Sequence, residues 1–250
     1  MDFDKFEHAK KVKQINSFWD LEELGRIRLS ENYYARDFLY SEIGSFYKVQ
    51  NIPQNIDLFV EAGTCIAQKI LEPLRKTFGN VALRSGYRSK ELNGFGNKNN
   101  LKCASNESNY AQHIWDEKDK NGNIGAVACI FIPWFNDRFK NELEFTRLAI
   151  YLNHHLAGSY NEITFFSRQD CFNIGYRTNP ERNIFTTKEP KGQMFKNGEF
   201  ICERLGYDKE TDRIILQNEH EFKYEKLTSG LFGNGLDLMD LCKGFPEWKS

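Results

Sequence analysis

Two arginines around a glycine give the segment "LRSGYRSKELN", Leu83–Asn93, the residue types for binding an anion. Gly86 allows a tight turn, and Arg84 and Arg88 flank it with positive charge. A planar guanidinium offers two parallel N–H donors, which match the two oxygens of a carboxylate or a phosphate. The segment therefore predicts a loop that holds an anionic group. The competing interpretation of Arg88 is a surface arginine that hydrogen-bonds to its own loop.

Cysteines are the other reactive side chains of the chain, and their spacing is uninformative. No two of them form a C-x-x-C pair, so the sequence indicates neither a structural zinc site nor a disulfide framework. In a reducing compartment such cysteines are expected to be buried thiols that pack as small apolar residues. The six are Cys65, Cys103, Cys129, Cys171, Cys202 and Cys242.

Composition restricts the class of protein to which the chain belongs. Its 250 residues are 40% hydrophobic and 28% charged, with a formal net charge of -1. This balance disfavours bulk electrostatic binding to nucleic acid. No apolar run approaches the roughly 20 residues of a membrane span, and the first residues lack the apolar core of a signal peptide. We therefore expect a cytoplasmic globular protein that does not bind membranes.

The spacing of apolar residues predicts the helices and strands that must position the loop. Helical spacing of apolar residues predicts helices over residues 4–28, 54–79 and 137–158, with Pro73 loosening the end of the second and Gly79 closing it. Apolar runs predict strands over residues 80–89 and 125–135, and a strand pair over 162–167 and 171–177. Residues 94–125 are expected to be mostly loop, with helical potential at 110–115. Turns at "KNGE" and "DKETD" predict β-hairpins after residue 188.

The order of these motifs resembles that of the M15 zinc peptidases, the D-Ala-D-Ala carboxypeptidases and murein endopeptidases. The similarity covers residues 28–187 and depends most on "EPLR" and "SGYRSKELN". It implies an α+β fold in which helices pack on one side of a small antiparallel sheet. Residues 1–27 would then be an N-terminal helical segment and residues 188–250 a β-hairpin extension packed on the domain. The resemblance also implies that Tyr87 and Arg88 contact the ligand, with Arg88 binding its carboxylate or carbonyl oxygen.

The zinc ligands are where the sequence departs from the family pattern. "AQH" supplies His113, but Cys129 stands in "GAVAC" at the position of the aspartate ligand. Asn173 stands in "CFNIGYR" at the position of the second histidine. The catalytic glutamate would fall near "TFFS", where neither Phe166 nor Ser167 is a general base. We expect His113, Cys129 and Asn173 to converge at one end of the sheet.

Zinc is therefore not the expected cofactor. A catalytic zinc ion needs about three protein ligands and one open position, and an asparagine amide is a poor substitute for imidazole. A remodelled site would need a third ligand from His154, His155 or His220. The first two are more typical of a helix surface or terminus.

Several functions remain open at the level of sequence. The cleft could bind a small anionic or peptide-like ligand through Arg88, Gln112 and Asn173 without catalysis. Alternatively, Cys129, His113 and Asn173 could act as nucleophile, base and orienting residue, the types that papain-like enzymes use. A variant zinc peptidase is a third alternative.

An interaction module is the alternative from another class of protein. Aromatic and apolar residues after Lys188 could cover the fold or meet a protein partner. Loop lysines lie beside acidic residues, so a nucleic-acid partner is not expected. The extension residues in question are Met194, Phe195, Phe200, Tyr207, Phe222 and Tyr224.

Overall fold

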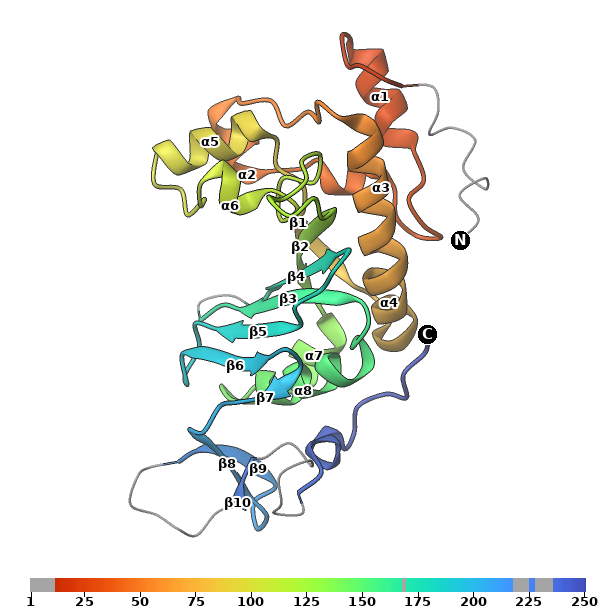
Figure 1. Ribbon diagram of the computed structural model, residues 1–250. Helices are drawn as coiled ribbons and strands as arrows, with labels where there is room; N and C mark the ends of the chain where they lie inside the picture. Colours follow the sequence, from red (N-terminus) through yellow and green to blue (C-terminus); the bar gives the residue numbers. More distant parts are fainter. Residues whose placement is uncertain (1–11, 168–169, 218–224, 228–235) are drawn as a thin grey trace.

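The computed structural model describes residues 12–167, 170–217, 225–227 and 236–250, which combine helices with a large mixed sheet (Figure 1). The predicted α+β class is confirmed. The helices and helical turns are α1 (Phe18–Arg26), η3 (Ala35–Phe38), α2 (Glu42–Tyr47), α3 (Ile56–Ile66), η4 (Ala67–Leu71), α4 (Glu72–Phe78), α5 (Lys90–Lys98), α6 (Asn106–Asn109), α7 (Pro133–Arg138), α8 (Phe145–His155) and η5 (Leu238–Cys242). The strands are β1 (Ala82–Ser85), β2 (Gly125–Phe131), β3 (Tyr160–Phe165), β4 (Phe172–Arg177), β5 (Asn183–Thr186), β6 (Gly192–Lys196), β7 (Glu199–Phe200), β8 (Leu205–Asp208), β9 (Arg213–Leu216) and β10 (Glu225–Lys226).

The long helix predicted over residues 54–79 is confirmed as the continuous run α3, η4 and α4. It begins at Asn55, whose side chain accepts a hydrogen bond from the Leu58 N–H at 3.1 Å. It ends at Gly79, whose φ of 81° belongs to the region that glycine adopts without strain. Its middle turn, η4, is a π-helix that ends at Leu71, and Pro73 follows in the first turn of α4. The proline therefore follows a widened turn of a continuous helix, where the sequence predicted a loosened end.

The main sheet is larger than the small antiparallel sheet that was expected. In the part of the chain that the structure describes, seven strands have the order β1-β2-β4-β3-β5-β6-β7. The β3–β5 pair is parallel, with Thr164 opposite Phe185. After β4 the chain crosses the end of the sheet at which β3 begins. It then forms β5, which lies on the side of β3 away from β4 and runs parallel to β3. The hairpin of β6 and β7 then extends the sheet past residue 187.

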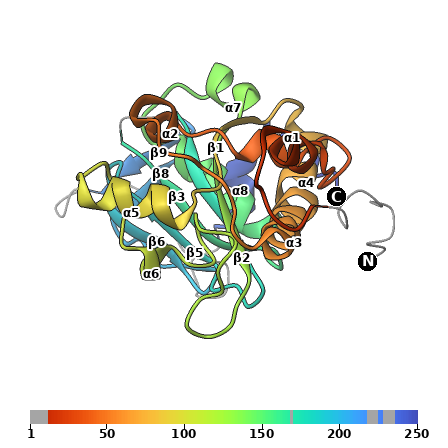
Figure 2. The same cartoon turned by 90° about the horizontal axis from the view of Figure 1, so that it is seen from above.

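Strand alternation divides the sheet into two different faces. On β2, Ala126, Ala128 and Ile130 join the apolar core, and α3 packs against β2 and β4 on this side. Cys129 points to the opposite face, where its register partner on β4 is Asn173. Helices α5 and α6 lie on the other side of the molecule from α3 and α4 (Figure 2). The face that carries Cys129 and Asn173 is therefore available for a site.

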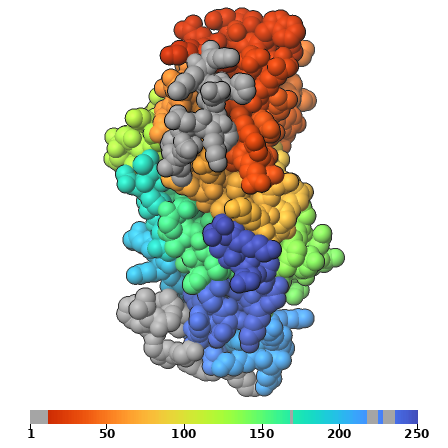
Figure 3. Space-filling view, turned by 90° about the vertical axis from the view of Figure 1, so that its right-hand side faces the viewer, coloured from red at the N-terminus to blue at the C-terminus, as the bar shows by residue number. Residues whose placement is uncertain are grey.

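The C-terminal residues extend the molecule and then return to the core. The predicted "DKETD" hairpin is confirmed as β8 and β9, which form a second sheet with β10 at the end of the molecule opposite α1 (Figure 1). Turn η5 packs on α8. The last residues lie beside α4 (Figure 3), where the Lys249 N–H donates to Thr77 Oγ1 at 3.0 Å. The Phe78 and Phe245 rings lie 6.4 Å apart there.

Two helix predictions need correction. The helix predicted over residues 4–28 begins at Phe18, because the Ser17 side chain caps it by accepting from the Asp20 N–H at 3.2 Å. Residues 1–11 lie outside the described residues. Residues 94–125 are mostly loop, as predicted, apart from the end of α5, which Ser89 caps by accepting from the Leu92 N–H, and the short α6. Residues 110–115 form turns instead of a helix.

Candidate functional site

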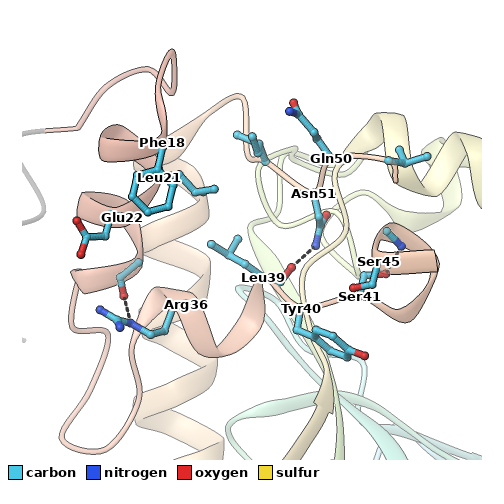
Figure 4. Close-up of a pocket in the computed structure, with 14 residues that line it drawn as sticks. Phe18, Leu21, Glu22, Arg36, Leu39, Tyr40, Ser41, Ser45, Gln50 and Asn51 are labelled. Carbon is cyan, nitrogen blue, oxygen red and sulfur yellow. Dashed lines mark hydrogen bonds between the residues drawn. The ribbon is translucent and has the colours of Figure 1, made fainter. Parts of the chain in front are cut away.

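The loop around Arg88 is held by one carboxamide, that of Asn51. Its Nδ2 donates to the Leu39 carbonyl at 3.0 Å and to the Tyr87 carbonyl at 2.8 Å. Its Oδ1 accepts from the Ser89 N–H at 2.7 Å. Figure 4 shows the Asn51 side chain reaching the Leu39 carbonyl. Because both peptide units beside Arg88 are bonded to this side chain, the loop has little freedom to move.

Arg88 itself carries a charge that no carboxylate of the described residues neutralises. Its Nη1 donates to Asn93 Oδ1 at 3.2 Å and to Cys103 Sγ at 2.7 Å. Its backbone N–H donates to the His113 carbonyl at 2.8 Å. Desolvation lowers the pKa of the Arg88 guanidinium from its ordinary value, since burial disfavours the charged form. A cation in this position favours the binding of an anion.

Asn93 closes the loop on its other side. This residue is completely buried, and its Nδ2 donates to the Ala104 carbonyl at 3.0 Å and to Asn106 Oδ1 at 2.9 Å. The asparagine at the end of "SGYRSKELN" therefore joins the Arg88 side chain to the segment that follows α5. The sequence did not predict this role for Asn93, nor that of Asn51, because their partners belong to other segments of the chain.

His113 and Asn173 meet in the structure as predicted. His113 Nδ1 lies 3.2 Å from the Gly86 carbonyl, and its Nε2 lies 3.2 Å from Asn173 Nδ2. These neighbours select the tautomer in which Nδ1–H donates to Gly86 and Nε2 accepts from Asn173. Desolvation, helped by the positive charge of Arg88, lowers the pKa of His113 to about 3. The imidazole is therefore neutral near pH 7.

A neutral His113 makes the stability of the fold dependent on pH. Its folded-state pKa lies below the unfolded value, so the stabilisation is complete above about pH 6.5 and is lost as the pH falls toward 3. We expect the free energy of unfolding to fall by up to about 2 kcal/mol between pH 6.5 and about pH 5. In His113→Asn the amide N–H can replace the Nδ1–H donor of the imidazole but does not titrate. The loss of unfolding free energy at acidic pH, measured by urea titration, should therefore disappear in this variant. The exposed His154→Asn is the matched control, and a wild-type slope in His113→Asn would contradict the assignment.

Cys129 lies beside this pair but is not poised as a nucleophile. It is the register partner of Asn173 on the neighbouring strand, and only 2% of it is exposed. Desolvation, followed by the neighbouring Cys171, raises the pKa of the Cys129 thiol to about 12. A thiol of this kind is protonated near pH 7, and the low pKa of His113 makes it a weak base. The burial of the Cys129 thiol and the directions of these two pKa shifts therefore argue against the thiol-enzyme alternative.

Two of the predicted ligand-binding residues, Tyr87 and Gln112, are placed differently from Arg88 and Asn173. The Tyr87 side chain is completely buried, with its ring 5.0 Å from that of Phe59 and 6.2 Å from that of Trp115. Gln112 uses its backbone carbonyl to accept from the Val127 N–H at 2.9 Å, and it is not among the cleft-lining residues. Tyr87 therefore borders the cleft from within the core, whereas Gln112 attaches the His113 segment to β2.

A cleft of about 680 Å³ opens over Arg88, His113 and Asn173. Its wall includes two further cations, Arg84 and Lys102, and one carboxylate, Glu42, which lies 3.5 Å from Arg84. The remaining lining residues come from the start of α2, from β1 and from the segments after β1, α5, β3 and β5. They are Tyr40, Ser41, Ile43, Ser85, Tyr87, Leu101, Ala104, Asn109, Phe166, Ser167 and Thr187.

The residues of this cleft do not fit a catalytic zinc ion. Both ring nitrogens of His113 already face Gly86 and Asn173. Within the described ranges, no group of three or more His, Cys, Asp or Glu side chains could hold a metal ion. Of the candidate third ligands, His155 stacks on Trp248 at 5.0 Å at the end of α8, and His154 lies beside it. His220 lies outside the described residues.

A second hollow of about 500 Å³ lies between α1 and the segment that leads through α2 to Ile52 (Figure 4). Its lining is largely apolar and includes Phe18, Leu21 and Leu39. Tyr40 lines both this second hollow and the Arg88 cleft.

The extension residues that could have met a partner mostly cover the fold. Met194 and Phe195 are buried in the core, and Phe200 and Tyr207 pack against it with part of their surface exposed. Phe222 and Tyr224 lie outside the described residues. Among the helices that the structure describes, none combines the length and the apolar character needed to cross a bilayer.

Comparisons with protein-family models, with curated proteins and with solved structures found no match to this chain.

Proposed function

We propose that this chain binds a small anionic or peptide-like ligand in the Arg88 cleft, on an M15-like fold that no longer hydrolyses peptides with zinc. The observation that carries the proposal is the partly buried guanidinium of Arg88, whose side-chain partners Asn93 and Cys103 are not carboxylates. A buried charge without a counterion is costly, and a bound carboxylate or phosphate would neutralise it. Asn173 offers a carboxamide in the same cleft to orient the ligand.

The loss of zinc chemistry is testable on the purified protein. We expect less than one equivalent of zinc per chain after purification without added metal, because His113 is the one family ligand retained. We also expect no release of D-alanine from a peptide ending in D-Ala-D-Ala. Elemental analysis that finds one tightly held zinc ion per chain would contradict the proposal. Single alanine variants of His154, His155 and His220 would then identify the missing ligand.

The anion site is tested by replacing Arg88 with lysine. Lysine keeps the charge but loses the planar fork, so we expect Arg88→Lys to weaken binding about tenfold or more. The probes are acetate, inorganic phosphate and N-acetyl-D-Ala-D-Ala, measured by calorimetry. Arg26→Lys, on the exposed surface of α1, is the matched control and should bind like the wild type. Equal affinity of Arg88→Lys and wild type for every probe would overturn the proposed function.

A further inference from the structure

The charge of the cleft indicates how many negative charges its ligand carries. Among the described residues that line it, Arg84, Arg88 and Lys102 bring three positive charges and Glu42 brings one negative charge. His113 is neutral near pH 7. The lining therefore has two net positive charges. A carboxylate would neutralise one of them, whereas a phosphomonoester, whose second ionisation has a pKa of about 6, would neutralise nearly both.

The same cleft also has an aromatic wall. Tyr40, which precedes α2, has 57% of its surface exposed although it is a large, partly apolar side chain. Phe166, which follows β3, lines the cleft from a different segment of the chain. Exposed aromatic faces beside positive charges are the combination by which proteins bind nucleotides, since a base stacks on the ring while the cations hold the phosphate.

Polar groups between the charged and the aromatic parts suit a sugar. Ser167 and Asn173 line the cleft and supply a hydroxyl and a carboxamide. Thr187 lies next to them, with its hydroxyl accepting from the Ser167 N–H at 2.8 Å. The cleft volume of about 680 Å³ accommodates a ligand with three such parts.

We infer that the ligand of the cleft is a nucleoside monophosphate, or another phosphomonoester that carries a sugar and an aromatic ring. Its phosphate binds Arg88 and its aromatic ring lies against Tyr40. This inference rests on the proposed function, because it names the class of the anion that the Arg88 cleft binds. Lys102 and Arg84 share the phosphate charge. No bond is made or broken in this step.

The experiment measures the affinity of the full chain for adenosine 5′-monophosphate, ribose 5-phosphate and adenosine by calorimetry. We expect the nucleotide to bind at least about tenfold more tightly than either fragment, since stacking on an aromatic side chain contributes strongly to affinity. Tyr40→Ala should reduce nucleotide binding to the level of ribose 5-phosphate, and Tyr40→Phe should retain it. Phe46→Ala, which removes a more exposed ring that does not line the cleft, is the matched control.

The outcomes separate this inference from the proposed function. If ribose 5-phosphate binds as tightly as the nucleotide, or if Tyr40→Ala has no effect, the ring is not recognised and the inference is wrong. In that case Arg88→Lys should still weaken ribose 5-phosphate, and the proposed anion site stands. If no phosphate or carboxylate probe binds, both fail.

Discussion

Replacing Asn51 with leucine is expected to lower the free energy of unfolding by about 3 kcal/mol or more, because it removes three hydrogen bonds at once. Two carbonyl groups, those of Leu39 and Tyr87, would lose their donor, and the Ser89 N–H would lose its acceptor. Each unsatisfied buried group costs about 1–3 kcal/mol, and leucine of similar size offers nothing in return. Urea unfolding followed by fluorescence measures the change.

The neighbouring residue provides the control for this substitution. Gln50 is exposed, and its side chain makes no hydrogen bond to any residue that the structure describes, so Gln50→Leu should change stability by less than about 0.5 kcal/mol. Asn51→Leu should also weaken anion binding under conditions where it stays folded, because the peptide units on both sides of Arg88 are released. A variant as stable as Gln50→Leu would show that Asn51 does not hold the loop.

Arg147→Met should destabilise the protein by about 3–5 kcal/mol, the range expected when one partner of a buried ion pair is removed. Arg147 on α8 is 5% exposed and lies 2.9 Å from the carboxylate of Glu144. Its guanidinium also donates to the Leu241 carbonyl at 3.0 Å and to the Asp212 carbonyl. The substitution therefore leaves a buried carboxylate unpaired and releases two contacts to the C-terminal region.

A double variant distinguishes the lost pair from the lost packing. Burial raises the pKa of Glu144, and Arg147 opposes that rise. In Arg147→Met/Glu144→Gln no charge is left behind, so part of the lost stability should return. Thermal unfolding of the two single variants and the double variant gives the coupling. If the double variant is no more stable than Arg147→Met, the unpaired carboxylate is not the cause.

The sequence was sufficient for the elements that carry a strong local signal. The helix from Asn55 to Gly79 combines a cap, a long apolar face and a terminating glycine, and the β3–β4 pair consists of two short apolar runs. The full extent of the sheet was not predictable, because the parallel pairing of β5 with β3 depends on how a short connection crosses a strand end. The alternation of apolar and polar residues along one strand does not indicate which strand pairs with it in the sheet.

The site was predictable only in part, for a related reason. The meeting of His113 with Asn173 was predicted from a family resemblance, and the structure brings the two together. Gln112 was predicted to bind the ligand, yet it lies in a turn and uses its backbone carbonyl to hold β2, and it does not line the cleft. The carboxamides of Asn51 and Asn93 were missed because an asparagine that bonds to distant backbone leaves no pattern in the sequence.

The π-helical turn η4 sets the rotation of α4 about the helix axis relative to α3. Each residue of an α-helix turns the chain by about 100°, so one residue more or fewer in this turn rotates everything beyond it by that angle. On the near side, α3 faces β2 and β4. On the far side, α4 points Glu72 at Ser30 and Asn32, and Phe78 at the C-terminal aromatic residues. The rotation introduced by this single turn thus allows one continuous helix to pack against the sheet with α3 and against differently oriented partners with α4.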